Sequence, residues 1–496
     1  MIDRSSSGGG GLRAGALGTF DSVVMAVAGC GPAYIVVALI PALVAAVGFA
    51  APAALLYGAI PMVGIALAFR HLGRLDVSAG ATYSWVARGL HPVLGFLSGW
   101  AVVAATTLFI VASTTSAGAA TLSLFDEDLA RSEVWSTAVG LGWFLLIAAL
   151  VAAGTRIAAG VRVVAVGVQL ALLLAVAVTA LTRDTHAAAF SFSWFGLGHF
   201  DATHSFTAGA LIVGAVYWGW DVTANLSEET RSGRGGSGLG GLIGLLVVAA
   251  TLLTLTVSTN MLLGPAAVTS DDETFLLLLG ETAWPGVGGT LLVLAVPLAM
   301  VATLETTLLQ VTRTLFAMGR DRMVPAFLGR VHPRRRTPVA STLVVCAFAV
   351  TTLTLVVLTD RGFVVLDDAL MGIGLLIAFY YTLAGITVAV AFRGVLLASL
   401  GNLIFLGLWP LTGVAFNIWV LVASARTLTG AQLAIGIGAL AVGLIPLGIA
   451  WFRGGRSFLR PRPLNSKDVT TAESSFEDVP AAGTADGRRE GLLSDF

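Results

Sequence analysis

Two long apolar segments of this 496-residue chain are interrupted by residues that do not continue a helix, and the second interruption contains an acid. The segments span residues 22–47 and 206–226, with the breaks at 29–32 and 218–221. Backbone that leaves a helix has unpaired N–H and C=O groups, for which lipid supplies no partners. It persists only where protein buries it or where it lines a wet cavity. Matching breaks in two halves of a chain therefore indicate the substrate site of a membrane transporter.

The first break could bind the charged end of a small solute without a charged side chain of its own. Gly29, Cys30 and Gly31 precede Pro32. The second half of a broken helix begins with free N–H groups, whose partial positive charge suits a carboxylate. Glycine lets backbone approach a ligand and adopt positive φ. We therefore assign Gly29, Cys30 and Gly31 to the carboxylate end of a solute. The alternative is that the two glycines only allow close helix packing.

The second break is surrounded by large aromatic rings. We assign Tyr217, Trp218 and Gly219 to the amine and the side chain of the solute, since the C=O end of a half-helix suits an ammonium group. An aromatic ring could also attract an amine through its π face, or cover the bound solute as a gate. Neighbouring side chains project in different directions, so Tyr217, Trp218 and Trp220 cannot all line one cavity. Trp218 or Tyr217 is the better candidate, and packing or lipid contact is the alternative role.

Acids inside apolar segments are candidates for function, because a charge at the bilayer centre is costly. Asp221 is expected either to cap unwound backbone or to carry a proton. Glu305 lies mid-segment, where a buried carboxyl could exchange protons or could simply bond to neighbouring hydroxyl groups. Thr306 beside it could supply an oxygen ligand to a cation. Glu228 and Glu229 are expected to form a salt-bridged inner gate or a solvated helix end.

The elements that position these residues are expected to be membrane helices. The chain is 56% hydrophobic and 11% charged, with a mean hydropathy of +0.90, whereas soluble domains carry about 25% charged residues. A spanning helix needs about 20 mostly apolar residues, and twelve segments qualify, which predicts an all-α polytopic membrane protein. The twelve segments are 20–47, 52–70, 92–121, 134–154, 161–181, 206–226, 239–263, 287–315, 338–358, 366–392, 395–423 and 431–452.

The loops between these segments differ in charge from one side to the other. Most arginines fall in alternate loops, as in 320–336, whereas the other loops are acidic, as in 126–128 and 271–273. By the positive-inside rule this bias places both termini in the cytoplasm. The expected location is the cell (inner) membrane. The chain then divides into a cytoplasmic N-terminal segment (1–19), a transporter domain (20–452) and a disordered cytoplasmic tail (453–496), which is polar and poor in aromatics.

Three stretches on the expected cytoplasmic side resemble signatures of the amino acid–polyamine–organocation permeases. The first combines small residues, a tyrosine and an aromatic with a following Gly-aromatic-x-x-Gly-Trp. The second joins a Gly-aromatic-acid step to Glu-Glu-Thr, and the third continues the eighth segment into an amphipathic cytoplasmic helix. They are residues 80–90 with 95–100, 219–221 with 225–230, and 313–321 with 324–325, 331–333 and 337–338. Together the resemblance covers about residues 15–450.

This resemblance implies a leucine-transporter-type fold. Such a fold has two inverted five-helix repeats, spans 1–5 and 6–10, with broken helices 1 and 6, plus two extra helices. One departure matters for coupling. Some proton-coupled members carry a lysine in the fifth span, but residues 161–181 contain none. Coupling through that lysine is excluded, and either H⁺ or Na⁺ remains as the coupling ion. No other cofactor is expected.

We therefore expect a secondary active transporter for amino acids or related small amines, working by alternating access. The alternative is a polyamine or ethanolamine-type organocation transporter or exchanger, which needs acids in its cavity. A transporter-derived membrane sensor is a further hypothesis, although the tail is short for an output domain. An enzyme is not expected, since no clustered catalytic set, metal-ligand spacing or nucleotide-binding loop is found. The formal net charge of zero does not suggest a nucleic-acid partner, and the oligomeric state is left open.

Overall fold

The computed structural model describes residues 11–183, 187–200, 204–231, 235–270, 275–359, 362–453 and 458–464. Within these residues every regular element is helical, apart from one isolated bridge between Leu17 and Thr230. Eleven described helices are long and apolar enough to cross a membrane, and Ser205–Val216 is a shorter apolar helix. The prediction of an all-helical polytopic membrane protein is therefore confirmed. The sixth predicted segment has no counterpart among these eleven, because its apolar helix ends at Val216 and is too short.

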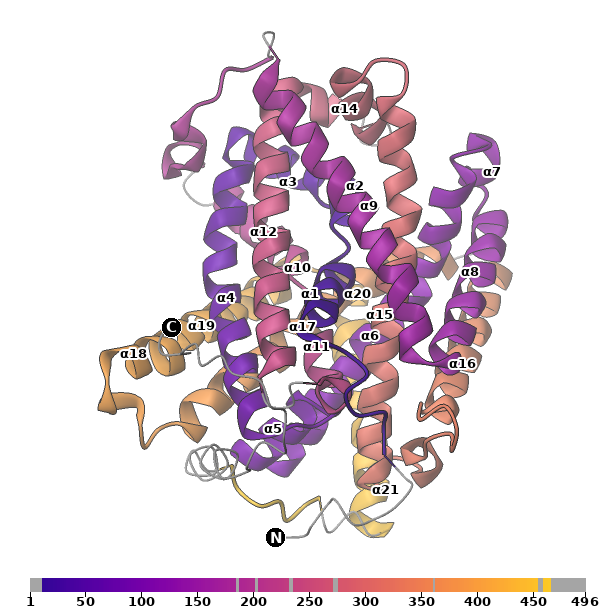
Figure 1. Ribbon diagram of the computed structural model, residues 1–496, viewed down its shortest axis with the longest axis vertical. Coiled ribbons are helices and arrows are strands. Elements are labelled where there is room, and N and C mark those ends of the chain that lie inside the picture. The colour runs from indigo at the N-terminus through magenta and orange to yellow at the C-terminus, as the bar shows by residue number, and fades with distance from the viewer. Residues whose placement is uncertain are drawn as a thin grey trace, which may run out of the picture.

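The apolar helices follow the predicted segments closely (Figure 1). In chain order they are α1 (Thr19–Cys30) with α2 (Pro32–Ala38) and α3 (Ile40–Val47), α4 (Ala51–Leu75), α6 (Pro92–Leu122), α8 (Glu133–Ala153), α9 (Thr155–Thr182), α10 (His204–Val216) with α11 (Val222–Asn225), α12 (Gly236–Leu262), α15 (Gly288–Arg320), α16 (Val339–Leu358), α17 (Gly362–Ala391), α19 (Trp409–Thr427), and α20 (Gly430–Val442) with α21 (Leu444–Arg453).

Short helices cover the two ends of the bundle. One end carries α5 (Thr82–Gly89), low in Figure 1, and is called the α5 face here; the opposite end carries α14 (Phe275–Ala283) and is called the α14 face. The segment at 264–286 forms α13 (Gly264–Ser270) and α14, while its residues 271–274 lie outside the described chain.

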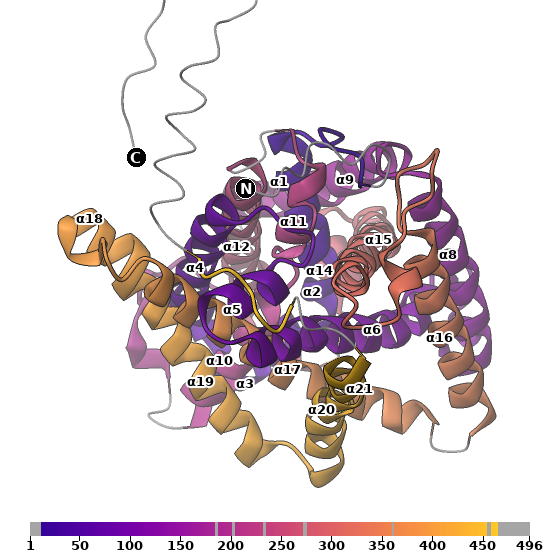
Figure 2. The same cartoon turned by 90° about the horizontal axis from the view of Figure 1, so that it is seen from below.

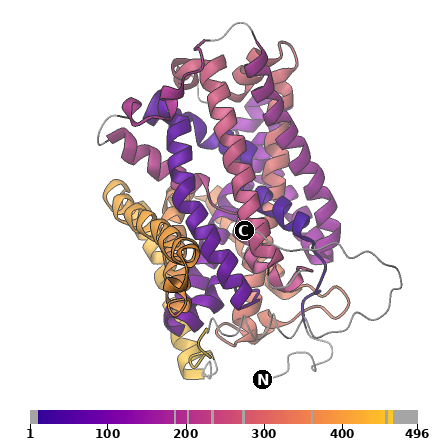
Figure 3. The ribbon, with the colours of Figure 1, turned by 60° about the vertical axis from the view of Figure 1, so that its left-hand side comes forward.

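The helices at the centre of the bundle are those that contain the predicted site residues. About 72% of the apolar window is buried in both the α1–α2 span and α15, against 22% in the α20–α21 span. Figure 2 shows α15 between α6 and α9 and shows α1 beside α12, and Figure 3 shows α18 (Leu400–Asn402) and α19 at one edge. The last helices therefore expose most of their surface to lipid and do not contribute to the centre.

Small residues explain how α1 fits into this centre. A Cβ at Gly240 of α12 would overlap Ser22, and a Cβ at Gly244 would overlap Ala26. Apolar side chains gain nothing by leaving lipid for a helix interface, so membrane helices associate where small residues allow close packing. The α1–α12 contact is of this kind. It fixes the first half of the broken helix against a long, continuous one.

The tenth and eleventh predicted segments are separate helices, joined by irregular backbone. After α17, the chain forms a 3₁₀ turn at Leu396–Ala398, the short α18 and a π-helical stretch at Leu403–Leu408 before α19. The side chain of Ser399 accepts a hydrogen bond from Asn402 N and caps α18. The prediction of 395–423 as one segment was therefore right about its position. It missed the irregular first half, which no periodicity in the sequence marks.

Candidate functional site

The first broken helix changes direction at Gly31. α1 ends at Cys30 and α2 begins at Pro32, as predicted. Gly31 has φ 64° and ψ 62°, a left-handed conformation that favours glycine. A Cβ at this position would also overlap the Thr303 hydroxyl oxygen of α15. Both the backbone conformation and the close approach of α15 therefore require glycine here.

The second broken helix leaves helical geometry between Val216 and Val222, again as predicted. Gly219 in this stretch has φ 102°. It faces the first break directly: a Cβ at Gly219 would overlap the carbonyl oxygen of Gly29, and a Cβ at Gly29 would overlap the carbonyl oxygen of Gly219. The two breaks therefore touch through their backbones. This contact also fits the packing alternative for Gly29.

The backbone donors at the start of α2 are already partly used. Gly31 N donates to Val27 O, and Pro32 has no N–H. Ala33 N donates to Oε1 of the buried Gln169 of α9 at 3.3 Å. A solute carboxylate would therefore compete with Gln169 for this end of the helix. The predicted carboxylate site at residues 29–31 has fewer free donors than a broken helix alone would offer.

Asp221 is the acid of the second break, and it is 1% exposed. Its carboxylate accepts hydrogen bonds from Gln310 Nε2 at 2.9 Å, Tyr380 Oη at 2.9 Å and Tyr381 Oη at 3.2 Å. All three donors are neutral groups, from α15 and α17. Within the described chain no arginine or lysine forms an ion pair with Asp221. The carboxylate thus has its hydrogen bonds satisfied, but no positive charge balances it.

The three aromatic residues around the second break point in different directions, as their spacing predicted. Tyr217 is fully buried and donates its hydroxyl to Leu55 O of α4. Trp220 is also buried and stacks against Tyr381 with ring centroids 5.8 Å apart. Trp218 keeps part of its surface exposed, and its Nε1 donates to Tyr380 Oη at 2.7 Å. Trp218 is therefore the ring best placed to meet a solute.

Trp218 belongs to a small aromatic group on the α14 side of Asp221. Its ring meets Phe109 of α6 edge-on at 5.2 Å, and Phe109 meets Tyr34 of α2 at 6.3 Å. All three side chains are partly exposed. Tyr380 connects this group to Asp221, because it accepts from Trp218 and donates to the carboxylate. An aromatic surface and a buried acid are thus joined by a single hydroxyl group.

Glu305 forms a buried ion pair that the sequence did not predict. Its Oε1 accepts from Arg162 Nη1 of α9 at 2.7 Å, with the two side chains 7% and 1% exposed. The Thr306 hydroxyl instead donates to the carbonyls of Ala302 and Thr303 within its own helix. Glu305 therefore links α15 to α9, whereas the Thr306 hydroxyl bonds to backbone carbonyls of α15 itself.

Comparison with known proteins identifies the family. The pattern of the amino acid permease family matches residues 17–424. The chain belongs to this family. It is a permease of the amino acid–polyamine–organocation superfamily, as its motifs predicted, and a multi-pass membrane transporter rather than an enzyme.

Three relatives show the range within the family. The low-affinity putrescine importer PlaP of Escherichia coli is 26% identical over 344 residues, which cover 66% of this chain and 71% of PlaP. The branched-chain amino acid permease BcaP of Bacillus subtilis is 34% identical over 139 residues, 28% of this chain and 29% of BcaP. The vacuolar cationic amino acid transporter 4 of Arabidopsis thaliana is 29% identical over 142 residues, 29% of this chain and 23% of that protein. The match thus spans less than a third of BcaP.

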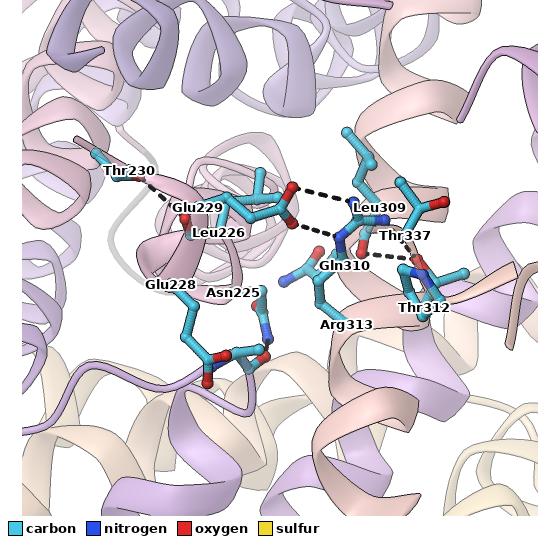
Figure 4. Close-up of polar contacts among 12 residues, drawn as sticks. Asn225, Leu226, Glu228, Glu229, Thr230, Leu309, Gln310, Thr312, Arg313 and Thr337 are labelled. Atoms are coloured by element: carbon cyan, nitrogen blue, oxygen red, sulfur yellow. Dashed lines mark hydrogen bonds and ion pairs between the residues drawn. The ribbon is translucent and has the colours of Figure 1, made fainter. Parts of the chain in front are cut away.

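The permease is closed at its α5 face by two ion pairs between the second broken helix and α15, and Figure 4 shows the one between Glu229 and Arg313. Arg313 Nε donates to Glu229 Oε1 at 2.8 Å, with both side chains 0% exposed. Arg320 pairs with Glu228 at 2.9 Å, nearer the surface. Of the two alternatives for Glu228 and Glu229, the salt-bridged one is present. The partners come from α15 rather than from the nearby loop.

The two ion pairs Glu229–Arg313 and Glu228–Arg320 are called the closure here, and further backbone and side-chain bonds reinforce it. Asn225 Nδ2 donates to Ala79 O at 2.9 Å and to Thr314 Oγ1 at 3.0 Å. The N-terminal segment adds a bridge, because Leu17 N donates to Glu229 O and Arg231 N donates to Leu17 O. Four parts of the chain therefore meet on the α5 side of the breaks. They are the N-terminal segment, the loop before α5, residues 222–231 (called the α11 region here) and the end of α15.

Some residues of the site were missed by sequence reasoning. Tyr380 and Tyr381 contribute two of the three bonds to Asp221, and Arg162 balances Glu305. A signal for the tyrosines existed, since adjacent hydroxyl groups within an apolar span need buried partners. Arg162 was an ionisable group inside a span and was a candidate on that ground. Among the described residues no group of three His, Cys, Asp or Glu side chains could hold a metal ion.

Proposed function

We propose that this permease is a secondary active transporter for amino acids or related small amines, with the solute bound where the breaks of α1–α2 and α10–α11 meet. The observation that carries the proposal is the position of Asp221. It lies fully buried two residues from Gly219, whose backbone touches Gly29. A buried carboxylate with only neutral partners lacks a balancing positive charge, and the ammonium group of a solute would supply that charge.

The amine end of the solute is placed at Asp221 and Trp218 in this proposal. Burying an isolated charge is costly unless an opposite charge accompanies it. An ammonium group brings that charge and three N–H donors. Trp218 adds an electron-rich ring that attracts a cation. Gly29, Cys30, Gly31 and Gly219 then form the backbone wall of the site, while the Tyr217 hydroxyl links it to Leu55 O of α4.

A second candidate is an organocation without a carboxylate, such as a polyamine or an ethanolamine-type amine. The specific support is the reduced number of free donors at the start of α2, where Gln169 already occupies the Ala33 N–H. A solute with no carboxylate leaves that bond intact. A zwitterionic amino acid has to displace the Gln169 oxygen and bond there instead.

We further propose that protons drive transport through Glu305, in preference to Na⁺. Protonation of Glu305 would remove the negative partner of Arg162 and leave an arginine buried without balance, which is strongly unfavourable. The arrival of a proton would therefore favour separation of α9 from α15. The hydroxyls of Thr306 and Thr307 donate to carbonyls of their own helix, which leaves their oxygen lone pairs free, so the preference for H⁺ rests on the Glu305–Arg162 pair.

The orientation proposed from arginine placement makes the α5 face cytoplasmic, in the cell membrane. Alternating access would then open the Glu229–Arg313 closure towards the cytoplasm and the Trp218 group towards the outside. We also propose that the chain has twelve membrane spans and that spans 1–5 and 6–10 form two inverted repeats. The two breaks occupy the same relative position in those halves, which is the support for this division.

The proposal is tested by ligand screening of the purified protein, followed by uptake into proteoliposomes. A ligand that binds only the folded state raises its unfolding temperature. We expect amino acids, polyamines or ethanolamine to give such a shift, and the same compound to be accumulated by proteoliposomes. Deaminated analogues with a carboxylate alone should give no shift. Stabilisation by those analogues, with none by amines, would contradict the proposal.

A further inference from the structure

The segment Phe458–Leu464, called the strap here, lies across α5 at the α5 face and is the yellow ribbon over α5 in Figure 2. The Phe458 side chain is buried, with 8% of its surface exposed. Its ring stacks face to face on Tyr83 of α5, with centroids 4.5 Å apart and planes 5° apart. A short chain segment beyond the last helix is thus anchored by an aromatic ring.

Main-chain groups fix the rest of the strap. Arg88 Nε donates to Arg462 O at 3.0 Å, and Leu464 N donates to Arg88 O at 3.2 Å. The guanidinium of Arg88 also pairs with Asp76 at 2.7 Å. The Leu464 side chain lies beside Gly89. The strap therefore follows α5 from its first turn to its last residue.

Away from the strap, the loop before α5 contacts the closure on the α5 side of the site. The loop before α5 accepts from Asn225 at Ala79 O and from Ser227 at Ser78 O, and Ala79 N donates to Glu228. α5 thus lies between the strap and the α11 region. Movement of the α11 region away from α15 requires that this loop move or that these bonds break.

The loop also contains a strained residue. Ala81, which precedes α5, has φ 43°, a region that residues with a Cβ rarely occupy. Such a conformation persists only while surrounding contacts hold it. Those contacts include the closure on one side and the strap on the other, in addition to the packing of α5 against α6 and α17. Release of either would allow Ala81 to relax and α5 to move.

We propose that the strap is a conformational clamp that holds α5 against the closure and slows opening of the α5 face. The proposal rests on the proposed function, in which that face opens during transport. Removal of the strap would raise the rate of opening. Because the strap continues into residues 465–496, any partner that binds those residues could draw it from α5 and so regulate transport.

The clamp should depend little on pH or salt. Burial raises the pKa of the Tyr83 hydroxyl well above its usual range, and the nearby Asp321 adds to this effect. The phenol is therefore neutral at physiological pH, and the Phe458–Tyr83 stack joins two uncharged rings. Aromatic stacking of this kind does not respond to the screening that weakens exposed ion pairs.

The test compares two shortened chains in inside-out vesicles. One chain ends after Leu464 and keeps the strap; the other ends after Ser457 and lacks it. Ser227→Cys is introduced in each as a reporter, since Ser227 is 1% exposed in the closure. Loss of the strap should raise the rate of labelling by an impermeant maleimide roughly fivefold, the effect of one aromatic contact. The chain ending after Leu464 should label like the full chain. Parent protein with only Cys30 and Cys346 gives the background.

If the shorter chain does not insert into the membrane, point variants of the full chain provide the same test. Phe458→Ala should reproduce the faster labelling, Phe458→Tyr should restore the slow rate, and Arg460→Ala, an exposed strap position, should have no effect. Equal labelling of Phe458→Ala and the full chain, in protein that still takes up substrate, would overturn the clamp. Labelling is measured without substrate, so a failed clamp and a failed transport assignment give different results.

Discussion

Asp221 and Glu229 are buried carboxylates at opposite ends of the short stretch that continues the second broken helix, and they are balanced in different ways. Glu229 meets the guanidinium of Arg313, and both side chains are 0% exposed. Asp221 meets two hydroxyls and an amide. Both carboxylates are buried, but only Glu229 has a positively charged partner. Glu229 therefore forms an ion pair within the closure, whereas Asp221 could still bind a cation.

Glu305 lies between these two cases. It has a cationic partner in Arg162, yet Nε and Nη2 of that arginine make no hydrogen bond to any described side chain or carbonyl. The pair is therefore less fully satisfied than Glu229–Arg313. An incompletely bonded pair is easier to rearrange, which is the property that the proposed coupling step needs.

The largest effect is expected at the closure. Arg313→Leu should lower the free energy of unfolding by about 3–5 kcal/mol, because it leaves Glu229 buried and unpaired. The double variant Glu229→Leu/Arg313→Leu should recover most of that loss. Denaturant titration in detergent measures both. Arg320→Leu, at the more exposed pair with Glu228, is the matched control and should cost about 1 kcal/mol or less. A double variant no more stable than the single ones would contradict the account of this closure.

Removal of the charge at Asp221 should affect binding rather than folding. Asp221→Asn keeps the shape, and its one carbonyl oxygen can still accept the bonds of Gln310 and Tyr380, which both reach Oδ2 of the aspartate. Its NH2 group then faces the Tyr381 hydroxyl, which can accept from it. Binding of amines should weaken roughly 100-fold, since a hydrogen bond to a charged group contributes about 1.5–3 kcal/mol. Isothermal titration with the amine found in the screen measures the change. Asp367→Asn, an exposed acid in α17, is the control. Unchanged affinity in the Asp221 variant would end its assignment to the amine.

The glycine at the first break should tolerate no side chain. Gly31→Ala should reduce transport roughly tenfold, because left-handed backbone costs about 1–2 kcal/mol for a residue with a Cβ and Thr303 is in the way. Gly142→Ala in α8 is the matched control, since nothing lies within 4 Å of its Cβ. Uptake per inserted molecule is the measurement. Normal uptake by Gly31→Ala would contradict the need for this backbone conformation.

Glu305→Gln tests coupling. A neutral amide keeps the hydrogen-bonding shape but cannot exchange a proton. The variant should lose accumulation driven by a pH gradient, which for one proton is about tenfold per pH unit, and should keep exchange of internal for external substrate. Proteoliposomes with and without an imposed gradient give both rates. Undiminished pH-driven accumulation would remove Glu305 as the coupling group and leave it a structural partner of Arg162.

The smallest effects are expected at the two aromatic residues Trp218 and Tyr217. Trp218→Phe keeps an aromatic ring but loses the bond from Nε1 to Tyr380. Affinity for an amine should fall by roughly fivefold, because a single neutral hydrogen bond contributes about 1 kcal/mol. Competition against the best ligand measures it. Tyr217→Phe should change affinity less, since that hydroxyl faces α4 rather than the Trp218 group. The reverse order of effects would exchange the two assignments.

The sequence predicted the helices and the two breaks because apolar length, Gly31, Pro32 and Gly219 are local signals. It could not predict which acids are balanced, because each partner comes from a distant helix. Arg162 is 143 residues from Glu305 and Tyr380 is 159 residues from Asp221. No local pattern encodes such a pairing. The free donors expected at the first break were also overestimated, since Gln169 lies in another helix.

The central claim is that the solute binds where the two breaks meet, and Cys30 offers the most direct measurement. The chain has two cysteines, Cys30 at the first break and Cys346 in α16, so the second is an internal control. A transported amine at about 100 times its Kd should slow alkylation of Cys30 by roughly 100-fold and leave Cys346 unchanged. Asp221→Asn should abolish the protection at the same amine concentration. Equal alkylation of Cys30 with and without a saturating, transported amine would contradict the account.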